Sequence, residues 1–425
     1  KYALQQFAPT KTLDPKILKE KPYPKKVLFE FKEMLEEYFE EALCGEKGLV
    51  KAKKDPLGRL IPVSSIIKKE PKDGASLILT IDYPIQLTAC SELKNAVEKY
   101  DAKSGSVLVM DPKTGKILAM CNYPDYDPNN YNKVEDINLF VNKAVSYAYE
   151  PGSMFKAFTM AAALDSGKVN PQTTYEDTGS VTIGSYTIRN SDLQSHGKQN
   201  MVQVLEKSLN TGAIFVVMEA GKDVFREYVE KFGFGELTEI ELPGEIKGDI
   251  SSLNQKGDIY TATASFGQGI TTTPIQLVSA FSVIANQGKL MKPYLVDEII
   301  YSDGTKTKTE PRVVREVLKS ETAVTLSAML ASVVENGYGN RAGVEGYYIA
   351  GKTGTAQVPN PDRPGYSNRT IHSFGGFGPI DDPRFAILVK LDSPTAVRFA
   401  ADSAAPVFKK IAEFILNYYG VLPER

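Results

Sequence analysis

Apolar runs of strand length lie near both ends of residues 75–425, and helical patterns fill the stretch between them. The runs at 106–110 and 116–120 flank Asp-Pro-Lys-Thr-Gly, a segment typical of a hairpin turn. Further strands are predicted late in the chain, at 347–358, 371–378 and 385–391. We therefore predict an α+β fold, with an antiparallel sheet flanked by helices and a mostly helical lobe.

The last predicted helix covers residues 406–419. Its apolar positions recur at helical spacing: Val407, Ile411, Ile415 and Tyr418. A proline in the first turn, Pro406, is tolerated because the N–H that it lacks would have no partner inside the helix. We expect the apolar side of this helix to be buried.

Residues 1–72 predict a small N-terminal domain, so we place the main domain at 73–425. A basic, proline-bearing start at 11–26 precedes a predicted helix at 29–43. The apolar stripe of that helix comprises Phe31, Leu35, Tyr38 and Phe39. A strand-like stretch at 59–67 and a polar linker at 68–74 follow.

Composition narrows the kinds of site that the chain can hold. Its 425 residues, 42% of them hydrophobic, can build a sizeable core in two or more domains. A net charge of −2 argues against nucleic acid as the main partner. The three cysteines are an odd number without metal-ligand spacing, and His196 and His372 lie far apart. We therefore predict no metal and no cofactor, and structural roles for both histidines.

Three short motifs carry candidate chemistry. Ser153 with Lys156 supplies a nucleophile and a base. Ser208 with Asn210 supplies a second hydroxyl and an amide, and Lys-Thr-Gly at 352–354 supplies a cation beside a glycine. Together these groups suit acyl transfer to a serine.

Each motif also has copies, so local structure must select among them. The copies are Ser65/Lys68, Ser91/Lys94, Ser195/Lys198, Ser252/Asn254 and Lys113 with its Thr-Gly. Their predicted settings are a strand-like run for Ser65, a helix surface for Ser91, polar loops for Ser195 and Ser252, and the hairpin turn for Lys113. None of these settings favours catalysis.

Ser153 follows a Pro-Gly pair and opens an apolar run rich in helix formers, which predicts a helix start. Unpaired N–H groups there favour a developing alkoxide. Lys156 lies on the same helix face, and burial among Phe155, Phe158 and Met160 would lower its pKa toward that of a useful base. An N-cap serine beside a solvated lysine is the alternative.

Ser208 and Asn210 follow a helical pattern and mark a predicted helix–loop junction. A serine and an amide in that position can relay a proton and bind a substrate amide. The alternative is hydrogen bonding that only ends the helix.

Lys352 lies in a predicted strand, and a glycine at 354 suits the close approach of another group to the backbone. Thr353 and Thr355 share one face of that strand by alternation. Lys352 then belongs to the other face, and the sequence leaves open how its side chain reaches the site.

With these choices made, the chain resembles the penicillin-binding proteins, most closely the class B monofunctional transpeptidases and, within them, the septal branch. The resemblance extends from about residue 74 to residue 423. Similar blocks lie at 79–82, 110–120, 149–153, 242–245, 266–269, 273–274 and 350–357. The blocks at 373–379, 382–384 and 404–408 are similar to the septal branch.

The resemblance implies a role for each catalytic candidate. Ser153 is the implied nucleophile and Lys156 its general base in acylation. Ser208 would relay a proton to the leaving group, and Asn210 would bind the amide of the donor peptide. Lys352 would support the relay electrostatically.

The resemblance also implies how the substrate is bound. Thr353 and Thr355 would bind the terminal carboxylate beside Gly354. The backbone N–H groups of Ser153 and Thr355 would form the oxyanion hole.

The implied activity is that of a peptidoglycan D,D-transpeptidase in septal cell-wall synthesis, with stem peptides as substrates and β-lactams as inhibitors. Implied partners are a membrane glycosyltransferase and proteins of the division complex. The chain begins at Lys1 and contains no run of about 20 apolar residues. We therefore expect a trimmed chain with a shortened pedestal domain, derived from a protein with one inner-membrane anchor and an extracytoplasmic catalytic domain.

Three alternatives stay open at this point. The first is a transpeptidase of the elongation branch. The second is a D,D-carboxypeptidase or β-lactamase-like hydrolase, for which Glu206 is the nearest candidate for a deacylating base. The third is a non-catalytic sensor of β-lactam or peptidoglycan.

Overall fold

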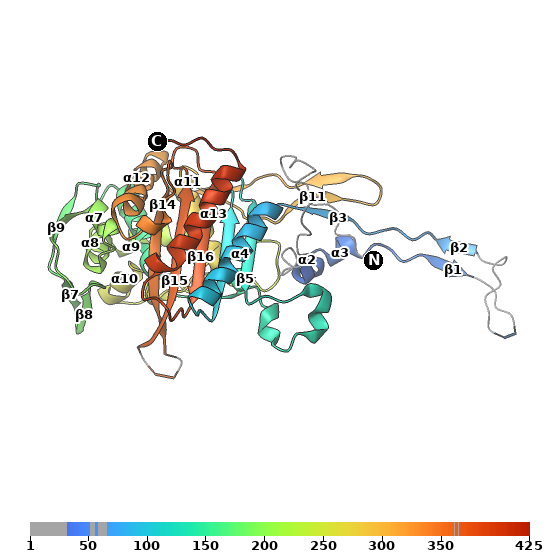
Figure 1. Ribbon diagram of the computed structural model, residues 1–425, viewed down its shortest axis with the longest axis horizontal. Helices are drawn as coiled ribbons and strands as arrows, with labels where there is room; N and C mark the ends of the chain where they lie inside the picture. The colour runs from blue at the N-terminus through green and yellow to red at the C-terminus, as the bar shows by residue number, and fades with distance from the viewer. Residues whose placement is uncertain (1–31, 52–55, 58–65, 361, 364) are drawn as a thin grey trace.

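The main sheet joins strands from both ends of the chain, as predicted (Figure 1). The computed structural model describes residues 32–51, 56–57, 66–360, 362–363 and 365–425. All neighbouring strands of the five-stranded sheet are antiparallel, in the order β14-β15-β16-β4-β5. Their bounds are β4 Ser104–Met110, β5 Ile117–Tyr123, β14 Ala350–Pro359, β15 Tyr366–Gly378 and β16 Phe385–Asp392. The predicted α+β fold is confirmed.

Two helices, α4 (Tyr83–Lys99) and α13 (Ala404–Tyr418), cover one face of this sheet, and α11 (Pro274–Ala285) covers the other (Figure 1). In β16, Ile387 and Val389 pack on the α4 and α13 side, whereas Leu388 belongs to the core on the α11 side. A strand buried on both faces explains the continuous apolar run in the sequence. The predicted buried side of the last helix is confirmed at Val407, Ile411 and Ile415, and its fourth position, Tyr418, is only partly buried.

The middle of the chain forms the predicted helical lobe (Figure 1). Its helices are α6 Lys156–Asp165, α7 Met201–Glu206, α8 Asn210–Ala220, α9 Lys222–Lys231, α10 Asp258–Ala264 and α12 Ser320–Asn336, whereas the short helix α5 (Lys143–Ser146) packs on β4, β5 and α11 of the sheet layer. Short strands accompany them: β6 Thr174–Asp177, β7 Ser180–Ile183, β8 Tyr186–Arg189, β9 Gly197–Asn200, β10 Lys289–Met291 and β13 Val313–Glu316. The pairs among these strands are β6-β9, β7-β8 and β10-β13.

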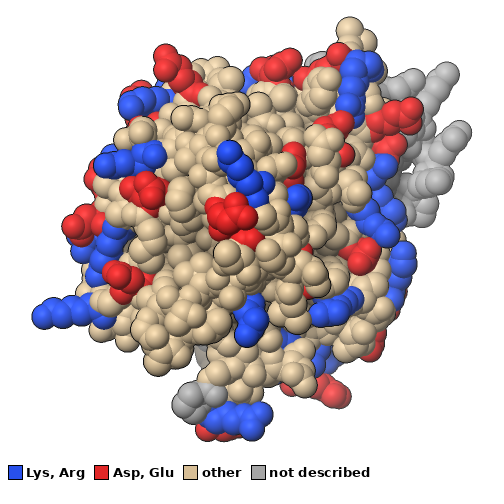
Figure 2. Space-filling view, turned by 90° about the vertical axis from the view of Figure 1, so that its left-hand side faces the viewer, with Lys and Arg blue, Asp and Glu red and all other residues tan. Residues whose placement is uncertain are grey.

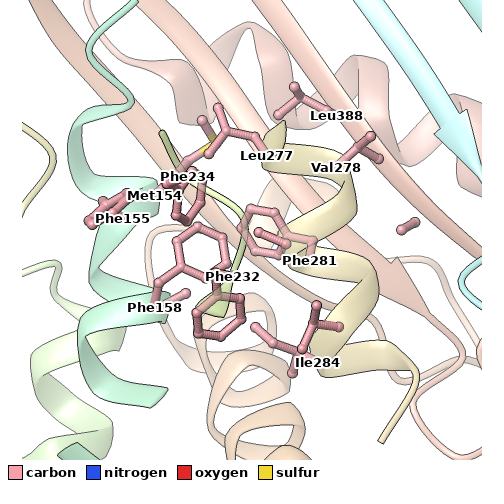
Figure 3. Packing of buried hydrophobic residues seen from close by; sticks show 14 of the residues in the cluster. Met154, Phe155, Phe158, Phe232, Phe234, Leu277, Val278, Phe281, Ile284 and Leu388 are labelled. Carbon is pink, nitrogen blue, oxygen red and sulfur yellow. The ribbon is translucent and has the colours of Figure 1, made fainter. Parts of the chain in front are cut away.

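An aromatic cluster joins the lobe to the helix behind the sheet (Figure 3). Phe158 of α6 lies at its centre, with ring centroids 5.0 Å from Phe232, 5.2 Å from Phe234 and 5.2 Å from Phe281 of α11. Tilted and edge-on ring pairs of this kind add about 0.5–1.5 kcal/mol each beyond their buried area. The cluster therefore fixes α6, the helix that follows Ser153, against the sheet layer.

The N-terminal residues form an extended arm beside the main body (Figure 1). Its described elements are α2 Lys32–Tyr38, α3 Glu40–Leu43, β1 Leu49–Lys51 and β2 Ile66–Lys69. β1 pairs with β2, and β3 (Ser76–Leu79) joins β11 (Val296–Ile300), which pairs with β12 (Lys306–Lys308). Leu35 and Leu43 belong to the same apolar cluster as the main core. The division at residues 72 and 73 stays a prediction.

Two sequence predictions in this arm are wrong in detail. The predicted helix at 29–43 is interrupted at Phe39, and Tyr38 is 51% exposed although it was part of the predicted stripe. A short surface helix buries a narrow i, i+4 stripe, here Leu35, Phe39 and Leu43, so the i+3 position lies at its edge. The predicted linker at 68–74 begins inside β2. Phe31 and the stretches 11–26 and 59–65 lie outside the described residues.

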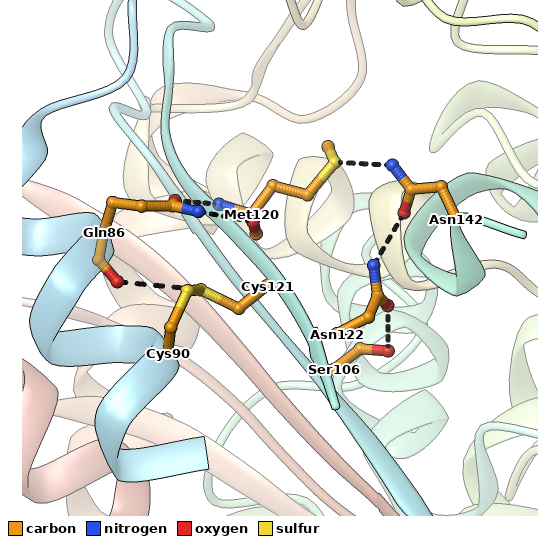
Figure 4. The surroundings of a disulfide bond; sticks show 7 residues. All are labelled: Gln86, Cys90, Ser106, Met120, Cys121, Asn122 and Asn142. Carbon is orange, nitrogen blue, oxygen red and sulfur yellow. Dashed lines mark hydrogen bonds between the residues drawn. A yellow bond between two sulfur atoms is a disulfide. The ribbon is translucent and has the colours of Figure 1, made fainter. Parts of the chain in front are cut away.

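A disulfide ties α4 to the edge strand of the main sheet (Figure 4). It joins Cys90 of α4 to Cys121 of β5, which are separated by 31 residues in the chain. The remaining cysteine, Cys44, is exposed and free. The sequence count gave no pairing, because the pairing depends on α4 lying against β5.

Replacing both Cys90 and Cys121 by alanine should lower the free energy of unfolding by about 3–4 kcal/mol, because the cross-link restricts the unfolded chain over a 31-residue loop. Urea denaturation followed by circular dichroism measures this loss. Cys44→Ala is the matched control and should change stability by less than about 0.5 kcal/mol. A double variant as stable as the wild type would contradict the prediction.

The surface agrees with a nearly neutral chain. The end of the molecule that carries the lobe shows both signs of charge, interspersed with uncharged area (Figure 2). In the part of the chain that the structure describes, no helix is both long and apolar enough to cross a membrane. Those same residues contain no group of three or more His, Cys, Asp and Glu side chains that could hold a metal ion.

Candidate active site

The three sequence motifs come together where the helical lobe meets the edge strand β14. Ser153 lies in a 3₁₀ turn, Gly152–Phe155, that leads directly into α6, so the predicted helix start is confirmed. Gly152 has φ +57°, and a Cβ on Gly267 would lie 2.3 Å from the Gly152 carbonyl oxygen. The two glycines let the backbone before Ser153 pack directly against Gly267, in the connection between α10 and α11.

Lys156 is almost fully buried, with 1% of its surface exposed, and its amine faces four oxygen atoms. Its Nζ lies 3.1 Å from Ser153 Oγ and 2.8 Å from Asn210 Oδ1. It also lies 2.5 Å from the backbone oxygen of Ser208 and 3.2 Å from Ser208 Oγ. The lysine therefore touches both residues of the second motif as well as the candidate nucleophile.

This arrangement orients the amine of Lys156 as a proton acceptor for Ser153. A neutral amine has two N–H donors and one lone pair. The Ser208 carbonyl and Asn210 Oδ1 only accept hydrogen bonds, so they take both donors. Asn210 is fixed in that orientation because its Nδ2 donates to the Arg189 carbonyl at 2.8 Å. The lone pair is left for a hydroxyl proton, and the two hydroxyls within reach are those of Ser153 at 3.1 Å and Ser208 at 3.2 Å.

Burial, and then the positive charge of Lys352, lowers the pKa of Lys156 well below its usual value, while Asp192 acts in the opposite direction. The prediction that Lys156 loses hydration is correct, but its surroundings differ from those expected. Phe155 and Phe158 pack into the aromatic cluster (Figure 3), and polar groups of α8 and the Ser208 turn contact the amine instead. A neutral lysine at this position is what a general base requires.

Ser208 connects α7 to α8 in a left-handed conformation, with φ +53°. This turn directs both its carbonyl and its hydroxyl toward Lys156. The predicted helix–loop junction differs in one respect: the connection is only the short turn 207–209, and α8 begins at Asn210 itself. Gly212 lies inside α8, where a Cβ would come within 2.5 Å of Val204, so this glycine permits close packing of α7 and α8.

Lys352 is fully buried on β14, and its Nζ lies 3.0 Å from Ser208 Oγ. The hydroxyl of Ser208 thus bridges the two lysines of the site. Burial lowers the pKa of Lys352 to about 7. The side chain leaves β14 on the face that meets the lobe, which answers the question that strand alternation left open.

Gly354 lies on that same face of β14 against the segment that carries the nucleophile. A Cβ there would lie 2.9 Å from the Pro151 carbonyl oxygen and 2.9 Å from Met154. A close approach to the backbone was expected at this glycine, and the group that approaches belongs to the protein itself. Thr353 Oγ1 lies 3.4 Å from Lys352 Nζ, and Thr355 Oγ1 accepts a hydrogen bond from the Ala400 N–H at 3.1 Å. Thr355 keeps its hydroxyl proton for another acceptor.

One supporting residue was missed in the sequence. Asp177 is buried beside the start of α8 and accepts hydrogen bonds from Thr211 Oγ1 at 2.8 Å and Asn190 Nδ2 at 2.9 Å. His196 lies between this carboxylate and Asp192, with its ring nitrogens 2.8 Å and 3.1 Å from the two. Asp177 stands in an ordinary polar stretch without motif spacing, so no sequence signal distinguished it.

The other histidine has structural contacts. His372 on β15 is buried between Ser403 Oγ at 2.9 Å and Thr370 Oγ1 at 3.1 Å. Burial lowers its pKa to about 4, so the ring is neutral at pH 7. These contacts agree with the structural role expected for it.

The copies of the motifs lie elsewhere. Ser91 is exposed on α4, and Lys113 lies in the turn between β4 and β5, as predicted. Ser252 is in a short 3₁₀ helix, Ser251–Asn254, instead of the predicted loop. Ser195 precedes β9, and Ser65 lies outside the described residues.

The chain is similar to several known proteins. Residues 105–413 match the family described as penicillin binding protein transpeptidase domain. Stage V sporulation protein D of Bacillus subtilis is 38% identical over 395 residues, which cover 92% of this chain and 61% of that protein. The probable peptidoglycan D,D-transpeptidase PenA of Neisseria flavescens is 33% identical over 390 residues, covering 91% of this chain and 94% of that sequence.

The same likeness holds among solved structures. Penicillin binding protein 3 of Mycobacterium tuberculosis superposes with a TM-score of 0.79 at 28% identity, over 95% of this chain and 92% of that one. That protein has also been solved in complex with aztreonam. The chain spans 61% of the length of its Bacillus relative.

Proposed function

Because this chain belongs to the penicillin-binding protein transpeptidase family, in its class B branch, we propose that it is a peptidoglycan D,D-transpeptidase acting through an acyl-enzyme on Ser153. The observation that carries the proposal is the buried Lys156 amine, 3.1 Å from Ser153 Oγ and with its two donors occupied by other groups. Relatives named as D,D-transpeptidases support the reaction class.

In the proposed acylation, Ser153 Oγ attacks the carbonyl carbon of the penultimate D-Ala of a stem peptide, and its proton passes to Lys156. The peptide bond to the terminal D-Ala then breaks, and the leaving nitrogen receives a proton through Ser208. Lys352, in contact with Ser208 Oγ, stabilises this transfer electrostatically. An amine on a neighbouring peptidoglycan strand afterwards attacks the carbonyl carbon of the ester, forms the cross-link and releases Ser153.

We assign substrate binding to the strand and the second motif. Thr353 and Thr355 bind the terminal carboxylate beside Gly354. Asn210 Oδ1 keeps a free lone pair for the amide N–H of the donor peptide, because its other contact is Lys156. The backbone N–H groups of Ser153 and Thr355 form the oxyanion hole.

Intact mass spectrometry after exposure to benzylpenicillin tests the proposal. The wild type should gain one penicilloyl adduct that persists for many minutes, and Ser153→Ala should gain none. Ser91→Ala, in the exposed copy of the motif, is the matched control and should acylate normally. The carboxylate of Glu206, the candidate deacylating base of the hydrolase alternative, accepts a hydrogen bond from Ser332 Oγ at 2.5 Å.

The other outcomes of this experiment identify the alternatives. Rapid loss of the adduct with release of penicilloate would indicate a hydrolase. Absence of any adduct on the wild type would favour a non-catalytic binding protein and overturn the proposal.

We further propose a septal role, with an inner-membrane anchor preceding the extracytoplasmic domain and with a membrane glycosyltransferase and division proteins as partners. The blocks at 373–379 and 404–408 support the branch. A fluorescent fusion of the full-length protein in its own host should concentrate at division sites. Labelling along the lateral wall would favour the elongation branch instead.

The two lysines predict a bell-shaped pH profile for the second-order rate constant of acylation. The reactive state has Lys156 neutral and Lys352 protonated. Because the pKa of Lys352 is about 7, the rate should fall as the pH rises above 7 and this lysine loses its charge. The acid limb should follow protonation of Lys156, whose pKa is well below its usual value.

Stopped-flow acylation by a fluorescent penicillin between pH 5 and pH 10 measures this profile. Lys352→Arg keeps the positive charge throughout that range, so the alkaline limb should disappear in this variant. A wild-type rate that keeps rising above pH 8 would contradict the assignment.

A further inference from the structure

A row of polar residues crosses the α11 side of the main sheet, which is also the face toward the lobe. Directly paired positions form it, from β14 to β5: Gly354, Ser373, Lys390, Ser106 and Asn122. The adjacent rung on this face contains Leu388 and Leu108, which belong to the apolar core. The proposed mechanism uses only the β14 end of this row.

Hydrogen bonds hold both ends of the row. At the β14 end, Ser373 Oγ of β15 donates to the Gly354 carbonyl at 3.3 Å. At the β5 end, Ser106 Oγ donates to Asn122 Oδ1 at 2.8 Å, and Asn122 Nδ2 donates to Asn142 Oδ1 at 2.9 Å (Figure 4). Asn142 also caps α5, since it accepts the Ala144 N–H at 3.1 Å. The β5 end of the row therefore holds Asn142, where the segment leading to Ser153 begins.

Lys390 occupies the centre of the row, and its side chain is fully buried. It forms an ion pair with Asp392, which also accepts a hydrogen bond from Ser104 Oγ at 2.7 Å. Its Nζ lies 4.6 Å from the ring centroid of Tyr147 and 5.0 Å from that of Tyr149. A desolvated ammonium in contact with two aromatic rings attracts both of them.

The chain from residue 142 to residue 154 follows this row across the sheet. Asn142 is held at β5, Tyr147 and Tyr149 are held by Lys390 on β16, and Met154 packs on Gly354 of β14. Ser153 stands at the end of this path. Backbone pairing of Tyr149 with Thr272 also holds this segment, and the contacts along the row add to that support.

We propose that Lys390 is a positioning residue for acylation: by holding Tyr147 and Tyr149, it sets the place of Ser153 against β14. This inference rests on the proposed function. A buried ion pair is often no more stabilising than apolar residues of the same size. A displacement of about 1 Å at a reacting group, in contrast, can lower a rate by about 10²-fold. The effect of the pair should thus appear in the rate of acylation.

The test separates the acylation rate constant from the dissociation constant of the initial complex, using stopped-flow fluorescence with a fluorescent penicillin. In Lys390→Met/Asp392→Asn, which removes both charges, the rate constant should fall at least about tenfold while the dissociation constant stays within about twofold. Lys116→Met/Asp297→Asn removes a partly buried ion pair elsewhere in the domain and should leave both values unchanged.

A pair of tyrosine variants tests the same contact and leaves the ion pair of Lys390 and Asp392 in place. Tyr149→Phe keeps the ring and should acylate within about twofold of the wild type, whereas Tyr149→Leu should show the slow rate constant of the Lys390 variant. If Lys390→Met/Asp392→Asn does not fold, the comparison of Tyr149→Phe with Tyr149→Leu tests the role of Lys390 by itself.

The outcomes distinguish this inference from the proposed function. Wild-type rate constants in both Lys390→Met/Asp392→Asn and Tyr149→Leu would overturn the role of Lys390 and leave the transpeptidase assignment intact. A decrease only in the fraction of protein that titrates with penicillin would also overturn it, because that decrease reports unfolding. Failure of the wild type to acylate would overturn the proposed function itself.

Discussion

Replacing Lys156 by methionine should lower the second-order rate constant for acylation by benzylpenicillin by at least about 10³-fold. General bases contribute about 10²–10⁴-fold, and this amine also holds the Ser208 carbonyl and Asn210 in place. Methionine is unbranched and of similar length, so it fills the space without the cost of burying an amine. The melting temperature should therefore stay near that of the wild type while the adduct forms far more slowly.

The matched control is Lys94→Met, in the Ser-x-x-Lys copy on the surface of α4. Lys94 is exposed, and its contacts are a long ion pair of 3.9 Å with Glu98 and the ring of Tyr123 at 6.0 Å, so its loss should not alter the acylation rate. A Lys156→Met variant that acylates within tenfold of the wild type would rule out this lysine as the base. The intact-mass adduct and the melting temperature are read on the same samples.

Replacing Lys352 by methionine should lower the same rate constant by about 10²–10³-fold, the range found when one electrostatic donor is removed from an acyl-transfer site. The change removes the cation from Ser208 Oγ and from the place where the substrate carboxylate is proposed to bind. Lys352→Met should also lose the alkaline limb of the pH profile, because the group that titrates near pH 7 is gone.

Lys113→Met is the control for this variant, since it lies in the second Lys-Thr-Gly of the chain. Lys113 is exposed and pairs with Asp382 at the surface, away from the motif residues. The Lys113→Met variant should be acylated at the wild-type rate. An alkaline limb that persists unchanged in Lys352→Met would show that another group titrates there.

The site motifs were predictable from local patterns because each reports on its own stretch of chain. Ser153 has the signals of a helix start, and the structure places it in the first turn before α6. Lys352 and Gly354 lie in an apolar run with strand character, and they belong to β14. The copies at Ser91 and Lys113 were set aside for the same reason, and their observed settings on a helix surface and in a turn agree.

Contacts between distant stretches were not predictable in this way. The Ser208 hydroxyl lies between Lys156 and Lys352, which are 52 and 144 residues away from it in the chain. The pairing of Cys90 with Cys121 and the contacts of Lys390 with Tyr149 likewise depend on how the layers stack. A hydrophobic pattern identifies which face of a helix or strand is buried, but not which distant residues pack against that face.

The sequence by itself therefore determined the α+β class, the helix start at Ser153 and the strand at Lys352, because apolar periodicity and turn residues act within a few positions. Only the tertiary structure decided that Lys156 is a desolvated amine within hydrogen-bond distance of Ser153, and that Lys390 contacts Tyr147 and Tyr149 in the segment before that serine. The physical reason is that burial, which lowers the pKa of Lys156, comes mainly from groups that folding brings in from elsewhere in the chain.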